Sequence, residues 1–377
     1  MNKKKKVAIL TQSLGFNYGG IIQNYALQKV LKDLGYKAIT IDRNIENPHP
    51  KLKIFLSRYK KIITGYLSKS KTIDFLHYRK ISVNNRRFIR KNISISPKIL
   101  TTQSLKDYFN KKKFDVVVVG SDQVWRPSYS PNIYNFFLDF LKDKDNIKKV
   151  AYAASFGTEE WEFSDGETEI CGELIQNFDG ISVREDSGII LCDKYLHRQD
   201  AEHVLDPTLL LSEADYSKLI AKKKENIGLF TYILDNSENK NEFINHCSSI
   251  LELSIHRNQA KLPAENIIVE QLSDYIIPPI EIWLQGFRDA EFVVTDSFHG
   301  MVFSIINSKP FLVLVNKSRG ASRFESLLSK LDLEDRLIYD AEDFDFSILR
   351  KEIDYSPVSE KLNRLKEDSF HFINKYF

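Results

Sequence analysis

At 377 residues the chain is longer than one hydrophobic core usually supports, so we expect two domains. Hydrophobic residues make up 42% of the chain and charged residues 28%, and no run reaches the roughly 18 to 20 apolar residues of a membrane span. This composition excludes a disordered chain and a helical membrane protein. The three cysteines, Cys171, Cys192 and Cys247, lack the spacing of a metal site or redox motif, and an odd number is typical of a reducing compartment.

The net charge of +3 is unevenly distributed along the chain. Residues 51–91 contain 13 of the 54 basic residues but only one of the 51 acidic residues, Asp74. Such asymmetry indicates a polyanion or an anionic membrane surface as a neighbour, or else a solvated helical insertion. The basic amino terminus runs directly into an expected strand without a cleavage site, so we interpret it as the start of the fold and expect a cytoplasmic protein.

Strand-like segments alternate with amphipathic helical segments from the amino terminus onward, a pattern typical of parallel sheets covered by helices. The first strand is expected at 6–11, and the helix after it at 20–34, where apolar residues recur at helical spacing and Gly35 can end the helix. Further strands of this lobe are expected at 37–42, 114–120, 148–155, 180–183 and 203–206.

A seam is expected at 206–226, where Pro207 follows a strand end and a charged run precedes the strand IGLFTYIL. The second lobe continues with NIIVE (266–270), the helix candidate 279–290, the strand EFVVT (291–295) and a helix at 356–377. We predict an α/β protein with two Rossmann-like lobes, 1–215 and 216–377. The first lobe would carry a helical basic insertion at about 48–95, and the second lobe would include the C-terminal helix.

The segment EFVVTDSFHG places Asp296, Ser297 and His299 in the loop after an expected buried strand, where open α/β sheets bind ligands. This loop also faces the start of a helix, whose unpaired amide groups favour an anion, and Gly300 would let a ligand approach the backbone. The alternative is that Asp296 or Ser297 caps the helix and His299 is a structural loop residue.

Five other strand-end loops have the same character. They contain Asn17, Gly19 and Gly20; Ser121, Asp122, Gln123 and nearby Trp125; Ser155 and Gly157; Arg184; and Arg323. Each has a structural interpretation when taken alone: Asp122 as a cap, Trp125 as core, the arginines as surface ion pairs and the glycines as turns. Six such loops in one chain favour a common ligand site.

The order and spacing of several motifs resemble the polysaccharide pyruvyl transferase family over residues 7 to about 336. These motifs are NYGGIIQNYALQKVLKDLGY, VVVGSDQVW, AYAASFG, ISVRE, VLDPTLLL, TDSFHGMVFSIINSKPF and SRFESLLSKLDLEDR. The resemblance implies a fold similar to the GT-B glycosyltransferases. It also implies phosphoenolpyruvate as donor and a sugar hydroxyl pair as acceptor, which ends as a pyruvate ketal. The basic segment 51–91 matches none of these motifs.

The resemblance also implies roles for individual residues. Arg184 and Arg323 match family positions and would clamp the two charged ends of phosphoenolpyruvate, because a guanidinium pairs bidentately with either. Ser297 and Gly300 would add the helix start to this donor site. His299 would act as general acid or would protonate the leaving phosphate, and Asp122 would act as base or sugar orienter, although the sequence does not separate these roles. The residues expected on the acceptor side are Asn17, Tyr18, Gly19, Gln123, Trp125 and Ser155, with Tyr18 and Trp125 either against a sugar face or in the core.

The eight histidines are dispersed without ligand spacing, so we expect no metal and no cofactor beyond phosphoenolpyruvate as co-substrate. The expected acceptor is a polyprenyl-diphosphate-linked oligosaccharide of capsule or exopolysaccharide synthesis, reached from the inner membrane face, and no nucleic acid is expected. Two other interpretations stay open. One is a GT-B glycosyltransferase that uses a nucleotide sugar, and the other is a non-catalytic binder of acidic saccharide.

Overall fold

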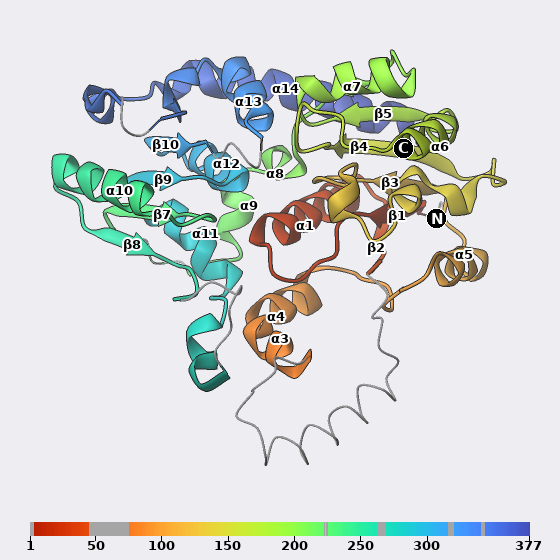
Figure 1. Cartoon of the computed structure of the whole chain (residues 1–377), viewed down its shortest axis with the longest axis horizontal. Coiled ribbons are helices and arrows are strands. Elements are labelled where there is room, and N and C mark those ends of the chain that lie inside the picture. The colour runs from red at the N-terminus through yellow and green to blue at the C-terminus, as the bar shows by residue number, and fades with distance from the viewer. Residues whose placement is uncertain are drawn as a thin grey trace.

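The computed structural model describes residues 4–44, 75–221, 223, 225–261, 269–315, 320–340 and 344–377. Residues 45–74, the larger part of the predicted basic insertion, lie outside the described residues. The described chain forms two parallel sheets with helices packed on them, as predicted (Figure 1).

The first sheet has the order β2-β1-β3-β4-β5-β6, and every neighbouring pair is parallel. Its strands are β1 (Lys6–Leu10), β2 (Lys37–Thr40), β3 (Val116–Val119), β4 (Lys148–Ala154), β5 (Gly180–Val183) and β6 (Glu202–His203). The four valines of β3 are all buried, because helices cover both faces of a parallel sheet. The main helices of this lobe are α1 (Tyr18–Asp33), α5 (Thr102–Lys111), α6 (Asp165–Ile175) and α7 (Asp186–Leu196).

The second sheet has the order β11-β10-β9-β7-β8. Its strands are β7 (Leu229–Tyr232), β8 (Ile255–Arg257), β9 (Phe292–Thr295), β10 (Phe311–Leu314) and β11 (Leu337–Ile338). The helices of this lobe are α10 (Glu238–Leu251), α11 (Ile280–Asp289), α12 (Phe298–Ile306) and α13 (Ser322–Leu331). The predicted segment NIIVE lies mostly outside the described residues, and Val269 begins a 3₁₀ helix, Val269–Tyr275.

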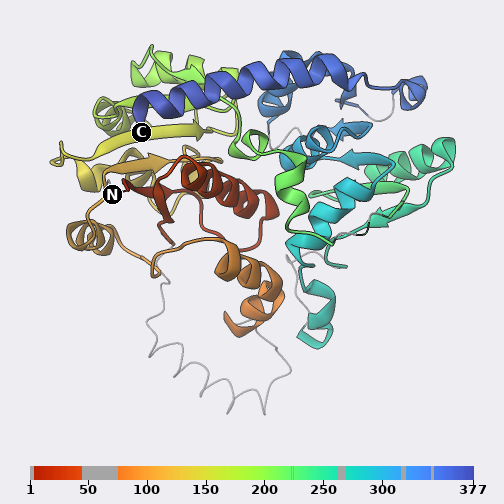
Figure 2. The same ribbon diagram turned by 180° about the vertical axis from the view of Figure 1, so that it is seen from behind.

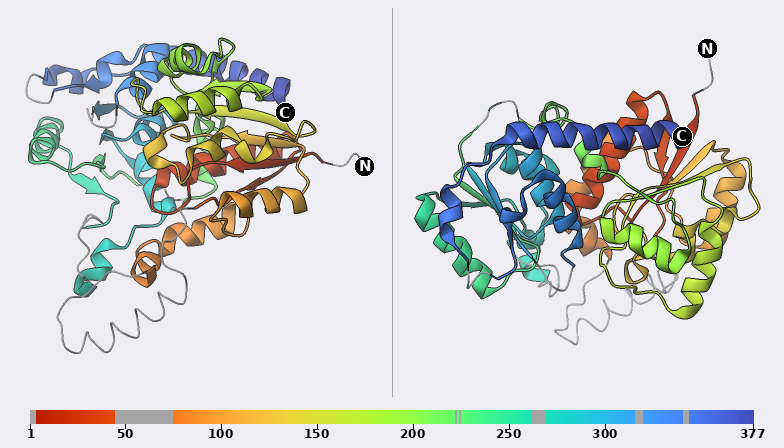
Figure 3. Two further views of the ribbon diagram at one scale, coloured as in Figure 1. Left: turned by 45° about the vertical axis from the view of Figure 1, so that its right-hand side comes forward. Right: turned by 90° about the horizontal axis from the view of Figure 1, so that it is seen from above.

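Two connections join the lobes. The short helices α8 (Pro207–Leu210) and α9 (Glu213–Ser217) lead from the first lobe to the second, and α14 (Tyr355–Tyr376) returns across the top of both (Figures 2 and 3). At its end, Ser369 Oγ accepts a hydrogen bond of 3.0 Å from the Leu205 amide, and Phe372 packs against Tyr152 of β4. The predicted lobe boundary at residue 215 stays a prediction. That boundary assigns α14 to the second lobe, but the end of α14 packs on the first lobe.

The described end of the basic insertion forms the helices α3 (Phe75–Ile81) and α4 (Val83–Asn92), which contact both lobes. Asn85 Nδ2 donates to the Gly15 carbonyl at 2.9 Å, and Asn84 Nδ2 donates to the Ile277 carbonyl at 2.8 Å. This helix pair therefore lies across the boundary between the lobes. Among the described helices, none combines the length and the apolar character that crossing a bilayer would require.

Candidate functional site

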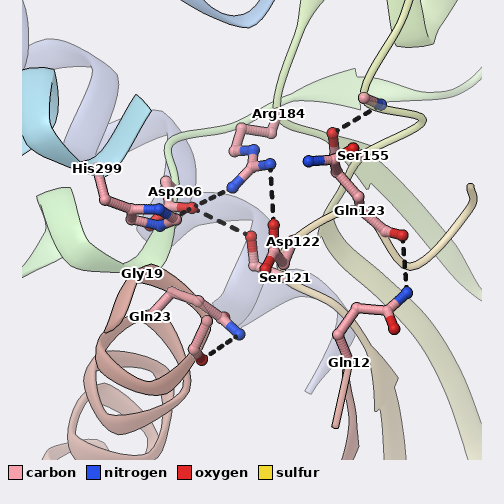
Figure 4. Close-up of polar contacts among 12 residues, drawn as sticks. Gln12, Gly19, Gln23, Ser121, Asp122, Gln123, Ser155, Arg184, Asp206 and His299 are labelled. Atoms are coloured by element: carbon pink, nitrogen blue, oxygen red, sulfur yellow. Dashed lines mark hydrogen bonds and ion pairs between the residues drawn. The ribbon is translucent and has the colours of Figure 1, made fainter. Parts of the chain in front are cut away.

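Charged side chains from both lobes meet at the carboxyl ends of the two sheets (Figure 4). Asp122 follows β3, Arg184 follows β5 and Asp206 follows β6, while His299 stands in the first turn of α12 after β9. All four are at least nine-tenths buried. The parallel strand order brings these loops to one edge, as expected for a ligand site in an α/β fold.

Arg184 lies between two carboxylates (Figure 4). Its Nη1 is 2.8 Å from Asp206 Oδ2, and its Nη2 is 3.4 Å from Asp122 Oδ1. Burial alone would lower the pKa of Arg184, but Asp206 and Asp122 raise it above its ordinary value. Burial would raise the pKa of Asp206, yet His299, Arg184 and the hydrogen bond from Thr208 hold it well below the usual range. Arg184 and Asp206 are therefore both charged at neutral pH.

His299 reaches this cluster from the second lobe. Its Nε2 is 3.6 Å from Asp206 Oδ2, longer than a direct hydrogen bond, and within the described part of the chain it has no hydrogen-bond partner. The ring rests against Gly19 of α1, where a Cβ would lie 2.2 Å from His299 Nδ1. A glycine is therefore needed at position 19 for the imidazole to approach Asp206.

We expect Gly19→Ala to lower stability by about 1–3 kcal/mol, the usual cost of overfilling a packed site, and to reduce turnover at least tenfold. The added methyl group must either push the two lobes apart or force the His299 imidazole to rotate. Either change moves His299 Nε2 away from Asp206. Thermal unfolding and steady-state kinetics measure the two effects. Gly15→Ala is the matched control because nothing lies within 4 Å of a Cβ there. Equal behaviour of the two variants would contradict this account.

Arg323 enters the cluster from α13, in the second lobe. The Arg184 guanidinium lies 4.7 Å from the centre of the Phe298 ring, and the Arg323 guanidinium lies 6.0 Å from the same ring. Burial and the neighbouring Arg184 lower the pKa of Arg323 to about 10. The two predicted clamp residues thus converge from different lobes on one aromatic ring beside His299, and their charges repel each other.

The family model for polysaccharide pyruvyl transferase matches residues 17–318. The chain belongs to this family. A search of curated proteins found no match.

Solved structures similar to this family member include Arabidopsis thaliana UGT89C1 complexed with UDP-L-rhamnose. It is 9% identical, with 98% of this chain and 95% of that chain covered and a TM-score of 0.53. A glycotransferase of kitacinnamycin is 10% identical over 98% of this chain and 96% of that chain, with a TM-score of 0.50. A glycosyltransferase from Rickettsia africae is 10% identical over 100% of this chain and 95% of that chain, also with a TM-score of 0.50. At these identities the likeness concerns the fold alone, which is of the GT-B type.

Two aromatic residues predicted on the acceptor side lie elsewhere. Trp125 is fully buried, stacks on Phe137 with ring centres 5.3 Å apart, and donates from Nε1 to the Phe136 carbonyl. Tyr18 is 3% exposed and donates its hydroxyl to the Pro278 carbonyl of the second lobe at 2.6 Å. Of the two positions left open for these rings, the structure has the interior, since both rings are buried and neither lies on an accessible face for a sugar.

Several small and polar residues of the predicted site support its backbone. Asn17 Oδ1 caps α1 by accepting from the amides of Gly19 and Gly20, and Ser297 Oγ caps α12 by accepting from the Gly300 amide at 3.3 Å. Gly300 packs on β9, since a Cβ there would lie 2.2 Å from Thr295 Oγ1, so close helix packing replaces the predicted approach of a ligand. Ser155 Oγ is buried and accepts from the Gly157 amide.

Asp122 and Gln123 stay in the loop beside Arg184. Asp122 has φ 80°, a left-handed conformation that is uncommon for a residue with a side chain and clusters at functional sites. Gln123 is half-buried, and its Oε1 accepts from Arg126 at 3.2 Å. Both residues therefore remain candidates for contact with an acceptor.

Sequence reasoning missed three members of the cluster. Asp206 contacts both Arg184 and His299, Phe298 supports both arginines, and Glu185 lies buried behind Arg184. Burial raises the pKa of Glu185 although Arg184 and Arg323 oppose the change, and its Oε1 accepts from the Phe156 amide at 2.9 Å. The position of Asp206, directly after a strand and before Pro207, was the sequence signal that could have identified it as a site residue. Within the described ranges, no group of three His, Cys, Asp or Glu side chains is placed to hold a metal ion.

The buried environment of a second histidine, His203, should make the folding stability of the protein depend on pH. Its Nε2 lies 3.1 Å from the Arg184 carbonyl, and Asp186 and Lys330 stand nearby. Burial, and then Lys330, lower the pKa of His203 from 6.5 to about 4. Below pH 6.5 the unfolded chain binds a proton that the folded protein refuses until about pH 4, so acidification destabilises the fold in this window.

In the wild type, His203 should lower the free energy of unfolding by up to about 3 kcal/mol between pH 6.5 and pH 4, and we expect His203→Gln to abolish this loss. Urea unfolding of the wild type and the variant across this range measures the difference. Parallel stability curves for the two proteins would show that His203 is not buried as a neutral group.

Proposed function

We propose that the protein transfers the pyruvyl group of phosphoenolpyruvate to two hydroxyls of a sugar, forming a pyruvate ketal and releasing phosphate. The observation that carries this proposal is the convergence of Arg184 and Arg323, from different lobes, on Phe298 beside His299. Two guanidinium groups suit a small donor with a carboxylate at one end and a phosphate at the other. No further cofactor takes part in this reaction.

The charges of the cluster favour an anion near Arg323. Asp206 and Asp122 pair with Arg184 and compensate its charge. Burial and Arg184 lower the pKa of Arg323 although Glu185 and Asp122 oppose the change, so a bound anion would further stabilise its charged form. We therefore assign the stronger contact with the donor to Arg323, and to Arg184 a second contact that Asp206 orients.

His299 and Asp122 supply the proton transfers in this scheme. Protonated His299 donates to the methylene carbon while a sugar hydroxyl attacks the central carbon, and Asp122 accepts the hydroxyl proton. Phosphate then leaves, the second hydroxyl attacks the same carbon, and its proton goes to the phosphate. Asp206 Oδ2 lies 3.6 Å from Nε2 of this proton donor. Proton exchange with solvent then removes the proton from Asp122 and returns one to His299 for the next turnover.

Phosphate release from phosphoenolpyruvate in the presence of a sugar panel tests the proposal. We expect release only when an acceptor is present, with a ketal carbon visible by NMR in the product. Turnover of a nucleotide sugar in place of phosphoenolpyruvate would identify a glycosyltransferase. Binding of saccharide with neither donor consumed would identify a non-catalytic binder.

We further propose that the acceptor is lipid-linked and that the protein works at an anionic membrane surface. The described part of the basic segment carries Arg79, Lys80, Arg86, Arg87, Arg90 and Lys91 on α3 and α4, without an acidic residue in either helix. Beside them Tyr78 and Phe16 are 43% and 45% exposed and form an edge-to-face pair. Cationic and aromatic side chains together suit a headgroup layer.

We expect vesicles with anionic lipid to sediment the wild-type protein at low salt, with less binding at high salt and on neutral vesicles. Changing Arg87, Arg90 and Lys91 to Gln should weaken binding by up to two orders of magnitude, at about 1 kcal/mol per cation. Changing Lys111, Lys112 and Lys113 to Gln removes the same charge elsewhere on the surface and serves as control. Equal partitioning of both variants would leave this segment a solvated helix pair.

A further inference from the structure

An open cavity of about 370 Å³ lies between α7 of the first lobe and α13 of the second. It begins next to the charged cluster, since Asp186 and Ser322 line it and are the chain neighbours of Glu185 and Arg323. It extends along the two helices to β11. A ligand in this cavity would therefore touch both lobes and reach the candidate site at one end.

Two buried hydroxyl groups without partners lie in the wall of this space. Ser322 is 8% exposed, and its Oγ has no hydrogen-bond partner among the residues that the structure describes. Oγ of Ser187, a residue that lines the cavity from α7, also has no hydrogen-bond partner among the described residues. Buried hydroxyls usually find partners, so these two are available to a ligand once a side-chain rotation turns them toward the cavity.

Four carboxylates also line the cavity: Glu159, Asp186, Glu325 and Glu334. Lys330 pairs with Asp186 at 2.9 Å, and Glu325 accepts from the Tyr339 hydroxyl. The two other carboxylates have no ion pair among the described residues. The cavity is thus negative, which disfavours an anion and favours a neutral ligand whose hydroxyls donate hydrogen bonds.

The cavity also has an apolar side. Ile190 and Tyr339 are 64% and 53% exposed and line it, together with Leu337. An exposed tyrosine ring beside carboxylates and hydroxyls suits a sugar, which presents an apolar face of C–H groups and a polar rim. Phosphoenolpyruvate has neither feature.

We propose that the cavity between α7 and α13 binds the neutral saccharide chain of the acceptor, leaving the anionic donor to the arginine cluster. This proposal rests on the proposed function for its choice of acceptor. It separates the two substrates by charge, with the positive part of the site for the donor and the negative part for the sugar.

Saccharide binding can be measured without any donor. An array of neutral disaccharides and their sulfated or carboxylated counterparts should show binding of neutral members to the wild-type protein. Tyr339→Ala should weaken that binding at least about tenfold, because large aromatic side chains dominate such contacts. Ile170→Ala removes a large side chain that is 44% exposed on α6, away from this cavity, and should leave binding unchanged.

Kinetics separate this proposal from the proposed function. With a disaccharide that binds, Tyr339→Ala should raise the acceptor KM about tenfold and leave the KM for phosphoenolpyruvate within twofold. Preference for anionic saccharides, no binding of any neutral one, or equal binding by the wild type and Tyr339→Ala would overturn the cavity assignment. Saccharide binding that depends on Tyr339, with no phosphate released, would overturn the proposed donor and leave the cavity assignment standing.

Discussion

Replacing Asp206 by asparagine should destabilise the protein by about 3–5 kcal/mol, the usual cost of removing one partner of a buried ion pair. The Arg184 side chain is 1% exposed, and Asp206 Oδ2 is its nearest carboxylate oxygen, at 2.8 Å. Asparagine keeps the shape but leaves the buried guanidinium with only Asp122 at 3.4 Å and Glu185 at 3.9 Å to compensate its charge. Turnover should fall as well, because Asp206 Oδ2 lies 3.6 Å from Nε2 of the proposed proton donor His299.

Urea unfolding at neutral pH measures this change, and Asp200→Asn is the matched control. Asp200 also pairs with an arginine at 2.8 Å, but its side chain is 55% exposed, so its loss should cost at most about 1 kcal/mol. Because the folded-state pKa of Asp206 is depressed, its contribution is complete above the ordinary carboxyl pKa and is lost as the pH falls below it. Similar losses for the two variants would mean that solvent screens the Arg184–Asp206 pair.

Local pattern was sufficient for most of the fold. Four consecutive valines predicted β3, and the helix after β1 was placed within two residues of its observed start because apolar residues recur at helical spacing. The strand β8 was missed because it has only three residues, Ile255–Arg257, and two of them are exposed polar residues at a sheet edge. No apolar alternation marks such a strand.

The candidate site was harder to predict, because a strand-end position does not say where a side chain points. Trp125 and Gln123 stand in the same loop, yet Trp125 packs into the core while Gln123 stays near the surface of the site. The contact between Gly19 and His299 joins residues of different lobes and depends on how the lobes pack, which no local pattern encodes. Asp206 was passed over because its importance lies in those same long-range contacts.

Replacing His299 by alanine should lower turnover by about 10²- to 10⁴-fold, the range expected when an acid–base group is removed. The fold should remain intact, since the ring lies at the contact between the lobes and its Nε2 has no hydrogen-bond partner among the described residues. Affinity for phosphoenolpyruvate should change much less, because the arginines provide the charge. His371→Ala, at an exposed histidine of α14, is the control and should behave as the wild type does.

The Gly19 contact allows a sharper test of where His299 acts. In the His299→Ala background, a Cβ at position 19 no longer meets an imidazole, so Gly19→Ala should cost little further stability there. A double-mutant cycle on unfolding free energies should therefore give a coupling of about 1–3 kcal/mol between the two positions, as contacting residues do. Additive effects would show that the imidazole does not rest on α1, and they would remove the geometric basis for its approach to Asp206.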